Sequence, residues 1–135
     1  MLLNLLNENE KHTFISLAIK AAESNGVVEN EEVELISDYC REMILDNINI
    51  NEYSTMTLEN IAEKISSSQK SHKKIILFEI MGLLCVDKVF DEEEKKFIYD
   101  FATKIGLEKD EMNKINSLLD QYLDVVNYVT EELAK

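Results

Sequence analysis

Two short acidic segments hold the side chains of this chain that are best suited to chemistry. They span residues 24–32 and 86–94, and each follows an apolar run and opens a second amphipathic segment. Clustered carboxylates in a loop can bind a divalent cation through their oxygen atoms. Carboxylates at the start of a helix can instead cap its free N–H groups. Both interpretations stay open, and they are compatible because a capping carboxylate keeps a second oxygen.

An EF-hand calcium loop is the first pattern to compare, and neither segment matches it fully. With Gly26 at the sixth position of that loop, Glu32 takes the twelfth. In the second segment Glu94 takes the twelfth position, and Lys88 replaces the glycine. The first position needs a carboxylate, but in the two segments it is occupied by Ala21 and Leu83. Neither segment is therefore a conventional EF-hand.

The capping interpretation has its own sequence signals. Asp91 followed three residues later by Glu94 is related to the capping box, in which the two side chains bond each other's backbone N–H groups. Acidic residues near a helix N-terminus are also favoured by the helix dipole, at about 0.3–1 kcal/mol each. Glu29, Glu31 and Glu32 occupy such positions in the first segment.

The elements around the two acidic segments repeat as well. Phe14 aligns with Ile76, and the pair Leu35-Ile36 aligns with Phe97-Ile98. The chain therefore contains an internal helix–acidic loop–helix duplication. With no proline, three glycines and no sustained alternating pattern, the 135 residues predict an all-α single domain, 1–135, of about six to seven helices. We expect helices at 10–23, from 30 onward, after Thr57, at 74–86, from 91 to about 105 and at 109–133, with a loop at 66–71.

The predicted helix over 74–86 is apolar on all sides, so we expect it at the centre of the domain. Gly82 within it indicates a close crossing with another helix. Glu79 is its only charge, and we expect it at the rim or in a salt bridge with a lysine such as Lys20, with a ligand role as the alternative.

The last predicted helix carries an unbroken three-four apolar repeat that is long enough to extend past the core. Such a stripe usually closes a bundle, and the alternatives are a partner helix or a homodimer. The stripe consists of Met112, Ile115, Leu119, Tyr122, Val126, Val129 and Leu133.

The formal net charge of −13 disfavours nucleic acid and anionic membrane surfaces and favours cations or a basic protein partner. No apolar run is long enough for membrane insertion, and residues 1–7 do not resemble a signal peptide, so we expect a cytoplasmic protein. Cys40 and Cys85 are expected to be reduced core thiols. His12 and His72 lack the Glu-x-x-His pairs of di-iron sites, and no nucleophile or phosphate-loop motif occurs, so we expect no enzyme and no catalytic residues.

The two acidic segments resemble the signature of the TerB-like family of tellurite-resistance and stress-response proteins, which also includes N-terminal domains of DnaJ-type cochaperones. The signature appears as Asn25-Gly26-Val27-Val28-Glu29 with Glu32, and as Asp87-Lys88-Val89-Phe90-Asp91 with Glu94. The resemblance runs from the first helix to about Leu119. Asn25 and Lys88 depart from it, because the family pattern has aspartate and glycine there.

The resemblance implies a non-enzymatic accessory protein of a stress or tellurite-resistance system, which binds a divalent cation. Oxygen ligands favour Ca²⁺ or Mg²⁺. The alternative is a metal-independent protein–protein interaction module that docks through its acidic surface or its last helix. Carried over by position, the candidate metal ligands are Asn25, Glu29, Glu32, Asp87, Asp91 and Glu94.

Overall fold

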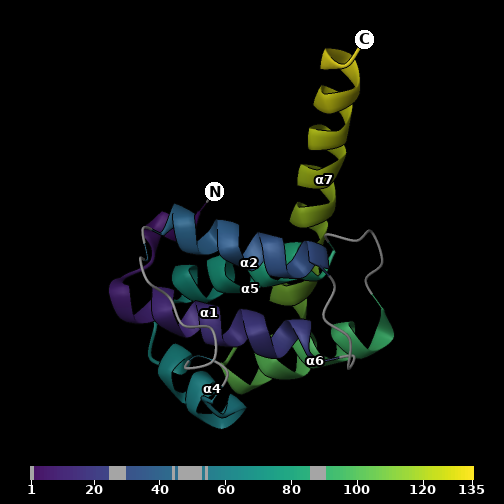
Figure 1. The fold of residues 1–135 in the computed structure, drawn as a ribbon. Helices are drawn as coiled ribbons and strands as arrows, with labels where there is room; N and C mark the ends of the chain where they lie inside the picture. The colour runs from purple at the N-terminus through teal and green to yellow at the C-terminus, as the bar shows by residue number, and fades with distance from the viewer. Residues whose placement is uncertain (1, 25–29, 44, 46–52, 54, 86–90) are drawn as a thin grey trace.

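A computed structural model of the chain describes residues 2–24, 30–43, 45, 53, 55–85 and 91–135 (Figure 1). The described residues form helices and no strands, which confirms the predicted all-α class. The elements are the 3-10 helix η1 (Leu3–Leu5) and the helices α1 (Glu8–Ala22), α2 (Asn30–Glu42), α4 (Leu58–Ser66), α5 (Lys70–Leu84), α6 (Glu92–Lys104) and α7 (Lys109–Leu133).

Several helix ends lie where local sequence signals predict them. The Thr57 hydroxyl accepts a hydrogen bond from the N–H of Asn60 and so caps α4. Gly106, with φ of 90°, ends α6 in the left-handed conformation that glycine adopts without strain. The N–H of Leu107 then bonds the carbonyl of Ala102, which completes a Schellman motif.

One predicted boundary is wrong, and one short helix was not predicted. The expected loop over residues 66–71 is shorter, because α5 already begins at Lys70. The η1 helix was not expected, and its Leu3 is buried, as is the following Leu6. Burial of apolar side chains against distant helices stabilises such a short helix more than its own hydrogen bonds do.

Helix α5 lies at the centre of the fold, as predicted, and touches η1, α1, α2, α6 and α7. The duplication is also visible in the core, because equivalent side chains are buried in both copies. Ile36 and Ile98 are one such pair. The others are Phe14 with Ile76, Ala18 with Ile80 and Tyr39 with Phe101.

Two pairs of equivalent residues meet each other across the duplication. His72 follows Glu10 by 62 positions, and their side chains are hydrogen bonded. Glu32 and Glu94 have the same separation, and their carboxylates interact electrostatically. A residue that meets its own equivalent lies near the axis that relates the two copies, so an approximate symmetry axis passes close to both pairs.

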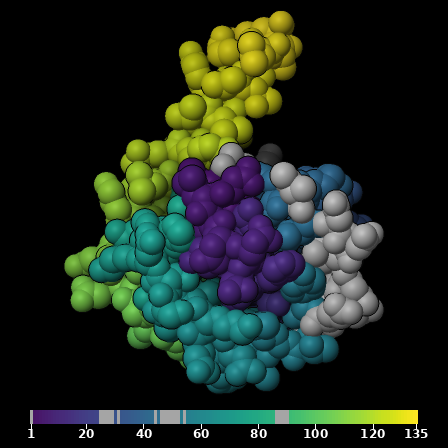
Figure 2. Space-filling model, turned by 90° about the vertical axis from the view of Figure 1, so that its left-hand side faces the viewer, coloured from purple at the N-terminus to yellow at the C-terminus, as the bar shows by residue number. Residues whose placement is uncertain are grey.

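Helix α7 leaves the body of the molecule. Its first half packs on α5, and its second half projects as a single helix away from the other elements (Figures 1 and 2). Across the part of the chain that the structure describes, no helix combines the length and the hydropathy that crossing a membrane requires.

Candidate functional site

Three of the six predicted metal ligands lie among the described residues. Glu32 lies in the first turn of α2, Asp91 caps α6, and Glu94 lies in the first turn of α6. Asn25, Glu29 and Asp87 fall outside the described residues. The structure therefore brings the final glutamate of each acidic segment into the interior, where both side chains are 3% exposed.

The predicted capping role of Asp91 and Glu94 is confirmed. The Asp91 carboxylate accepts a hydrogen bond of 2.8 Å from the N–H of Glu94. The Glu94 carboxylate accepts one of 3.4 Å from the N–H of Asp91. This reciprocal pair is a capping box, and it uses one oxygen of each side chain.

Glu94 is poorly stabilised as an anion. Burial raises the pKa of Glu94 to about 7, and the negative charges of Asp91 and Glu32 add to that shift. A bound cation would reverse the effect, because it would compensate for both the lost hydration and the repulsion between carboxylates. The electrostatics of this site are thus compatible with the predicted cation.

The geometry of a metal site is incomplete among the described residues. Within them, no group of three or more His, Cys, Asp or Glu side chains is placed to hold a metal ion. Oxygen sites for Ca²⁺ use six to eight ligands. Glu32 and Glu94 could supply carboxylate oxygens from the two copies, and the remaining ligands would have to come from elsewhere. Metal binding therefore stays a prediction.

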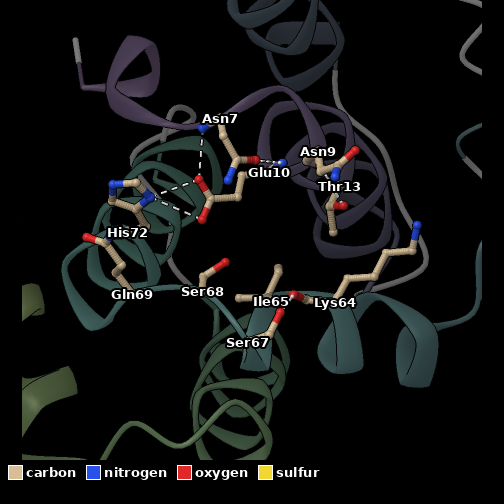
Figure 3. Close-up of a pocket in the computed structure, with 10 residues that line it drawn as sticks. All are labelled: Asn7, Asn9, Glu10, Thr13, Lys64, Ile65, Ser67, Ser68, Gln69 and His72. Atoms are coloured by element: carbon tan, nitrogen blue, oxygen red, sulfur yellow. Dashed lines mark hydrogen bonds and ion pairs between the residues drawn. The ribbon is translucent and has the colours of Figure 1, made fainter.

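A polar pocket of about 460 Å³ lies between the N-terminal ends of α1 and α5 (Figure 3). At its wall the Nδ1 atom of His72 lies 2.8 Å and 3.1 Å from the two oxygens of Glu10. Because an ionised carboxylate only accepts hydrogen bonds, Nδ1 carries the proton. Glu10 also accepts a 2.8 Å bond from the N–H of Asn7 and thereby completes the capping box of α1.

The Glu10–His72 pair is a clamp between two helix N-termini. Burial alone would raise the pKa of Glu10, but hydrogen bonds from Asn7, Ser68 and His72 together lower it below its ordinary value. The Ser68 hydroxyl is bonded to the same carboxylate, so it contributes to the clamp. The His72 bond joins α5 to α1, and the bonds from Asn7 and Ser68 hold the Glu10 carboxylate in place.

A groove of about 1120 Å³ lies where α7 separates from the body. The body contributes apolar side chains from α2 and α5, among them Leu35, Tyr39 and Phe78. The groove also contains Glu79, which corrects the predicted rim position, because this side chain is only 3% exposed. Its carboxylate accepts a 3.5 Å bond from the N–H of Leu2.

The apolar stripe of α7 changes from core to surface at this groove. Met112, Ile115 and Leu119 are buried against the body. The next members are exposed, from 39% at Val126 to 80% at Leu133. The stripe therefore closes the bundle with its first half only. Leu118, Val125 and Tyr128 widen the exposed apolar face.

The sequence contained partial signals for these features. Glu10 and His72 occupy equivalent positions in the repeat, but equivalence alone does not predict that two residues meet. The groove could not have been predicted, because it depends on the angle at which α7 leaves α5. Gly82 does meet α7 as expected, although a Cβ there would lie 3.9 Å from Leu119 Cδ1, so the crossing is not unusually close.

Comparisons of the chain with protein-family models, with curated proteins and with solved structures found no significant match. The resemblance to the TerB-like family therefore stays a prediction from the acidic segments and the duplication.

Proposed function

We propose that this protein is a non-enzymatic interaction module that docks a protein partner on the projecting half of α7. One observation carries the proposal: an unbroken heptad stripe runs from the core onto a helix that nothing in the described chain covers. Contiguous exposed apolar surface of this kind is typical of binding sites, and heptad spacing is the pattern by which helices pack on helices.

The proposal selects the last helix from the two docking surfaces that the sequence left open. It is compatible with the accessory role that the resemblance to TerB-like proteins implies. A partner of that stress or tellurite-resistance type remains an expectation.

Site-specific photocrosslinking in cells that produce the protein tests this proposal. A photoreactive residue at Val125 should give a discrete protein adduct, whereas one at the exposed Glu63 of α4 should not. Substituting Val126→Asn and Val129→Asn should weaken the adduct formed at Val125. Equal adducts at both positions, or an adduct that ignores the two substitutions, would refute docking on α7.

We also propose a second function, cation binding between the two copies of the repeat. The coupled, buried carboxylates of Glu32 and Glu94 favour it. Isothermal titration of metal-stripped protein with Ca²⁺ and Mg²⁺ tests it. Saturable binding tighter than roughly 100 µM, lost in the Asp87→Asn/Asp91→Asn variant and in Glu32→Gln/Glu94→Gln, would support the site. A flat titration would leave these acids as helix caps.

A further inference from the structure

Among the residues that the structure describes, the charged side chains that line the groove beside α7 are all acidic. They are Glu79 on the body and Asp120, Asp124 and Glu131 on α7. From Ile115 to Ala134 the sequence contains no cationic residue. An occupant of the groove therefore meets negative charge along its α7 side.

Glu79 lies on the body side of the groove, and a second carboxylate influences it. Burial raises the pKa of Glu79, the bond from the Leu2 N–H opposes that rise in part, and the carboxylate of Glu42 adds to it. The Oε2 atom of Glu42 is buried and has no hydrogen-bond partner within the described residues. A cationic side chain near Glu79 would favour the ionised form of its carboxyl group.

The shape of the groove fits a helix. Its lining residues on α7 run from Asn116 to Glu131, which in α-helical geometry is about 24 Å. An amphipathic helix of about four to five turns could place its apolar face on the apolar side chains of the groove, among them Phe78, Tyr122 and Leu123. Its polar face would then lie over the acids of the groove.

A second copy of the chain does not match this surface. Its own α7 would bring the same three acids, Asp120, Asp124 and Glu131, against their counterparts. Each copy also has a formal net charge of −13, and like charges across an interface disfavour association. Charge complementarity therefore selects a basic partner.

We propose that the α7 groove binds a basic amphipathic helix of a partner protein. The apolar face of that helix packs on Phe78, Tyr122 and Leu123 in the groove. Its lysine or arginine side chains pair with Asp120, Asp124 and Glu131 on α7. This inference rests on the proposed docking function and names the chemistry of the partner.

Designed peptides probe the inference with the full chain. Three labelled peptides of about eighteen residues share one leucine face, and their polar faces consist of lysine, glutamine or glutamate. Fluorescence anisotropy at about 150 mM salt measures their binding. The lysine peptide should bind at least about tenfold more tightly than the glutamine peptide, and the glutamate peptide should not bind. A scrambled lysine peptide without an apolar face should not bind either.

Matched variants locate the site. Neutralising Asp120→Asn, Asp124→Asn and Glu131→Gln together should weaken the lysine peptide about tenfold or more. Neutralising three exposed acids elsewhere, Glu59→Gln, Glu63→Gln and Asp100→Asn, removes the same charge and should change affinity by less than about twofold. Because all six positions are exposed, both variants should fold. Equal losses in the two variants would overturn the inference, since binding would then follow net charge alone.

The outcomes separate this inference from the function on which it rests. Equal binding of the lysine and glutamine peptides would overturn the basic partner but leave docking on α7 intact. A discrete crosslink at Val125 without lysine-peptide binding would do the same. Failure of all peptides and of the crosslink would refute both proposals. Binding of the chain to zwitterionic lipid vesicles, with no peptide binding, would assign the apolar face to a membrane surface.

Discussion

Glu10 and His72 show how single residues connect the two halves of the duplication. Each residue lies in the first turn of its own helix, and the hydrogen bond between them joins the two helix ends directly. Partial burial strengthens the bond, because surrounding protein screens charges less than water does. The pair therefore fixes α1 relative to α5 at one end of the symmetry axis.

The lowered pKa of Glu10 predicts a pH dependence. Because the folded-state pKa lies below the unfolded value, the ionised clamp stabilises the fold above the unfolded pKa, and this stability is lost as the pH falls through the folded pKa. Glu10→Gln should lower the free energy of unfolding by about 1–2 kcal/mol at pH 5. Urea unfolding should show the difference shrinking toward pH 3. A difference that grows as the pH falls would contradict the clamp.

The raised pKa of Glu94 predicts the opposite sign. Its folded pKa of about 7 lies above the unfolded value, so the fold is most stable below the unfolded pKa and loses stability as the pH rises through 7. The free energy of unfolding of the wild type should fall by an amount on the order of 1–2 kcal/mol between pH 5 and 8. Glu94→Gln keeps an oxygen for the capping box but cannot ionise, so it should not show this fall.

The neighbouring exposed residue supplies the control for that experiment. Glu93→Gln removes a charge from the same helix turn without touching the buried pair, so urea unfolding should give it the same pH profile as the wild type. If Glu94→Gln retains the wild-type pH profile as well, the pKa of Glu94 is not raised in the folded protein.

Residue-level signals in the sequence predicted local contacts better than distant ones. The capping box of Asp91 and Glu94 was predictable, because its partners lie three positions apart. Glu79 was expected at the rim or in a salt bridge with a lysine, and its burial rules out only the rim. The hydrogen bond from the backbone of Leu2, 77 positions away, was not predicted. Such a partner has no periodic signature and becomes visible only when η1 is packed.

At the scale of elements, local sequence patterns predicted where the helices lie but not how the helices pack against each other. Helical periodicity and end signals placed α4, α6 and α7 close to their observed bounds. The stripe on α7 favoured bundle closure over a partner helix or a second copy, although periodicity does not show where a core ends. Only the structure shows that coverage by the body stops after Leu119.

Substituting alanine for Gly82 and for Gly106 should change the free energy of unfolding in opposite directions. Gly82 lies within α5, and an added Cβ would make an ordinary contact of 3.9 Å with Leu119, so Gly82→Ala should raise the free energy of unfolding by about 0.5–1 kcal/mol. Gly106→Ala should lower it by about 1–2 kcal/mol, because φ of 90° strains any residue with a Cβ. Chemical denaturation measures both. A destabilising Gly82→Ala would mean that α5 and α7 cross more tightly than described.

For the whole molecule, charge and shape act together. The second half of α7 projects from the body of the molecule (Figure 2), and one of its faces exposes apolar side chains. Such a face alone would promote self-association, whereas the formal net charge of −13 opposes it. The combination favours a partner of opposite charge over a second copy.

The chain alone should therefore be monomeric. Sedimentation velocity at about 150 mM salt should give the mass of one chain, 15.6 kDa, at micromolar concentration. A dimer that dissociates on Val126→Asn would show that α7 pairs with itself despite its charge.

Amide hydrogen exchange across α7 tests the central claim most directly. It would be measured on the chain alone and on its complex with the protein that crosslinking at Val125 identifies. A helix without tertiary contacts opens readily, so amides of residues 124–133 should exchange fast in the free chain while those near Ile115 are protected. In the complex the distal amides should slow strongly, with α4 unchanged. Protection of the distal half in the free monomer, or slowing confined to α4 or α6, would contradict docking on α7.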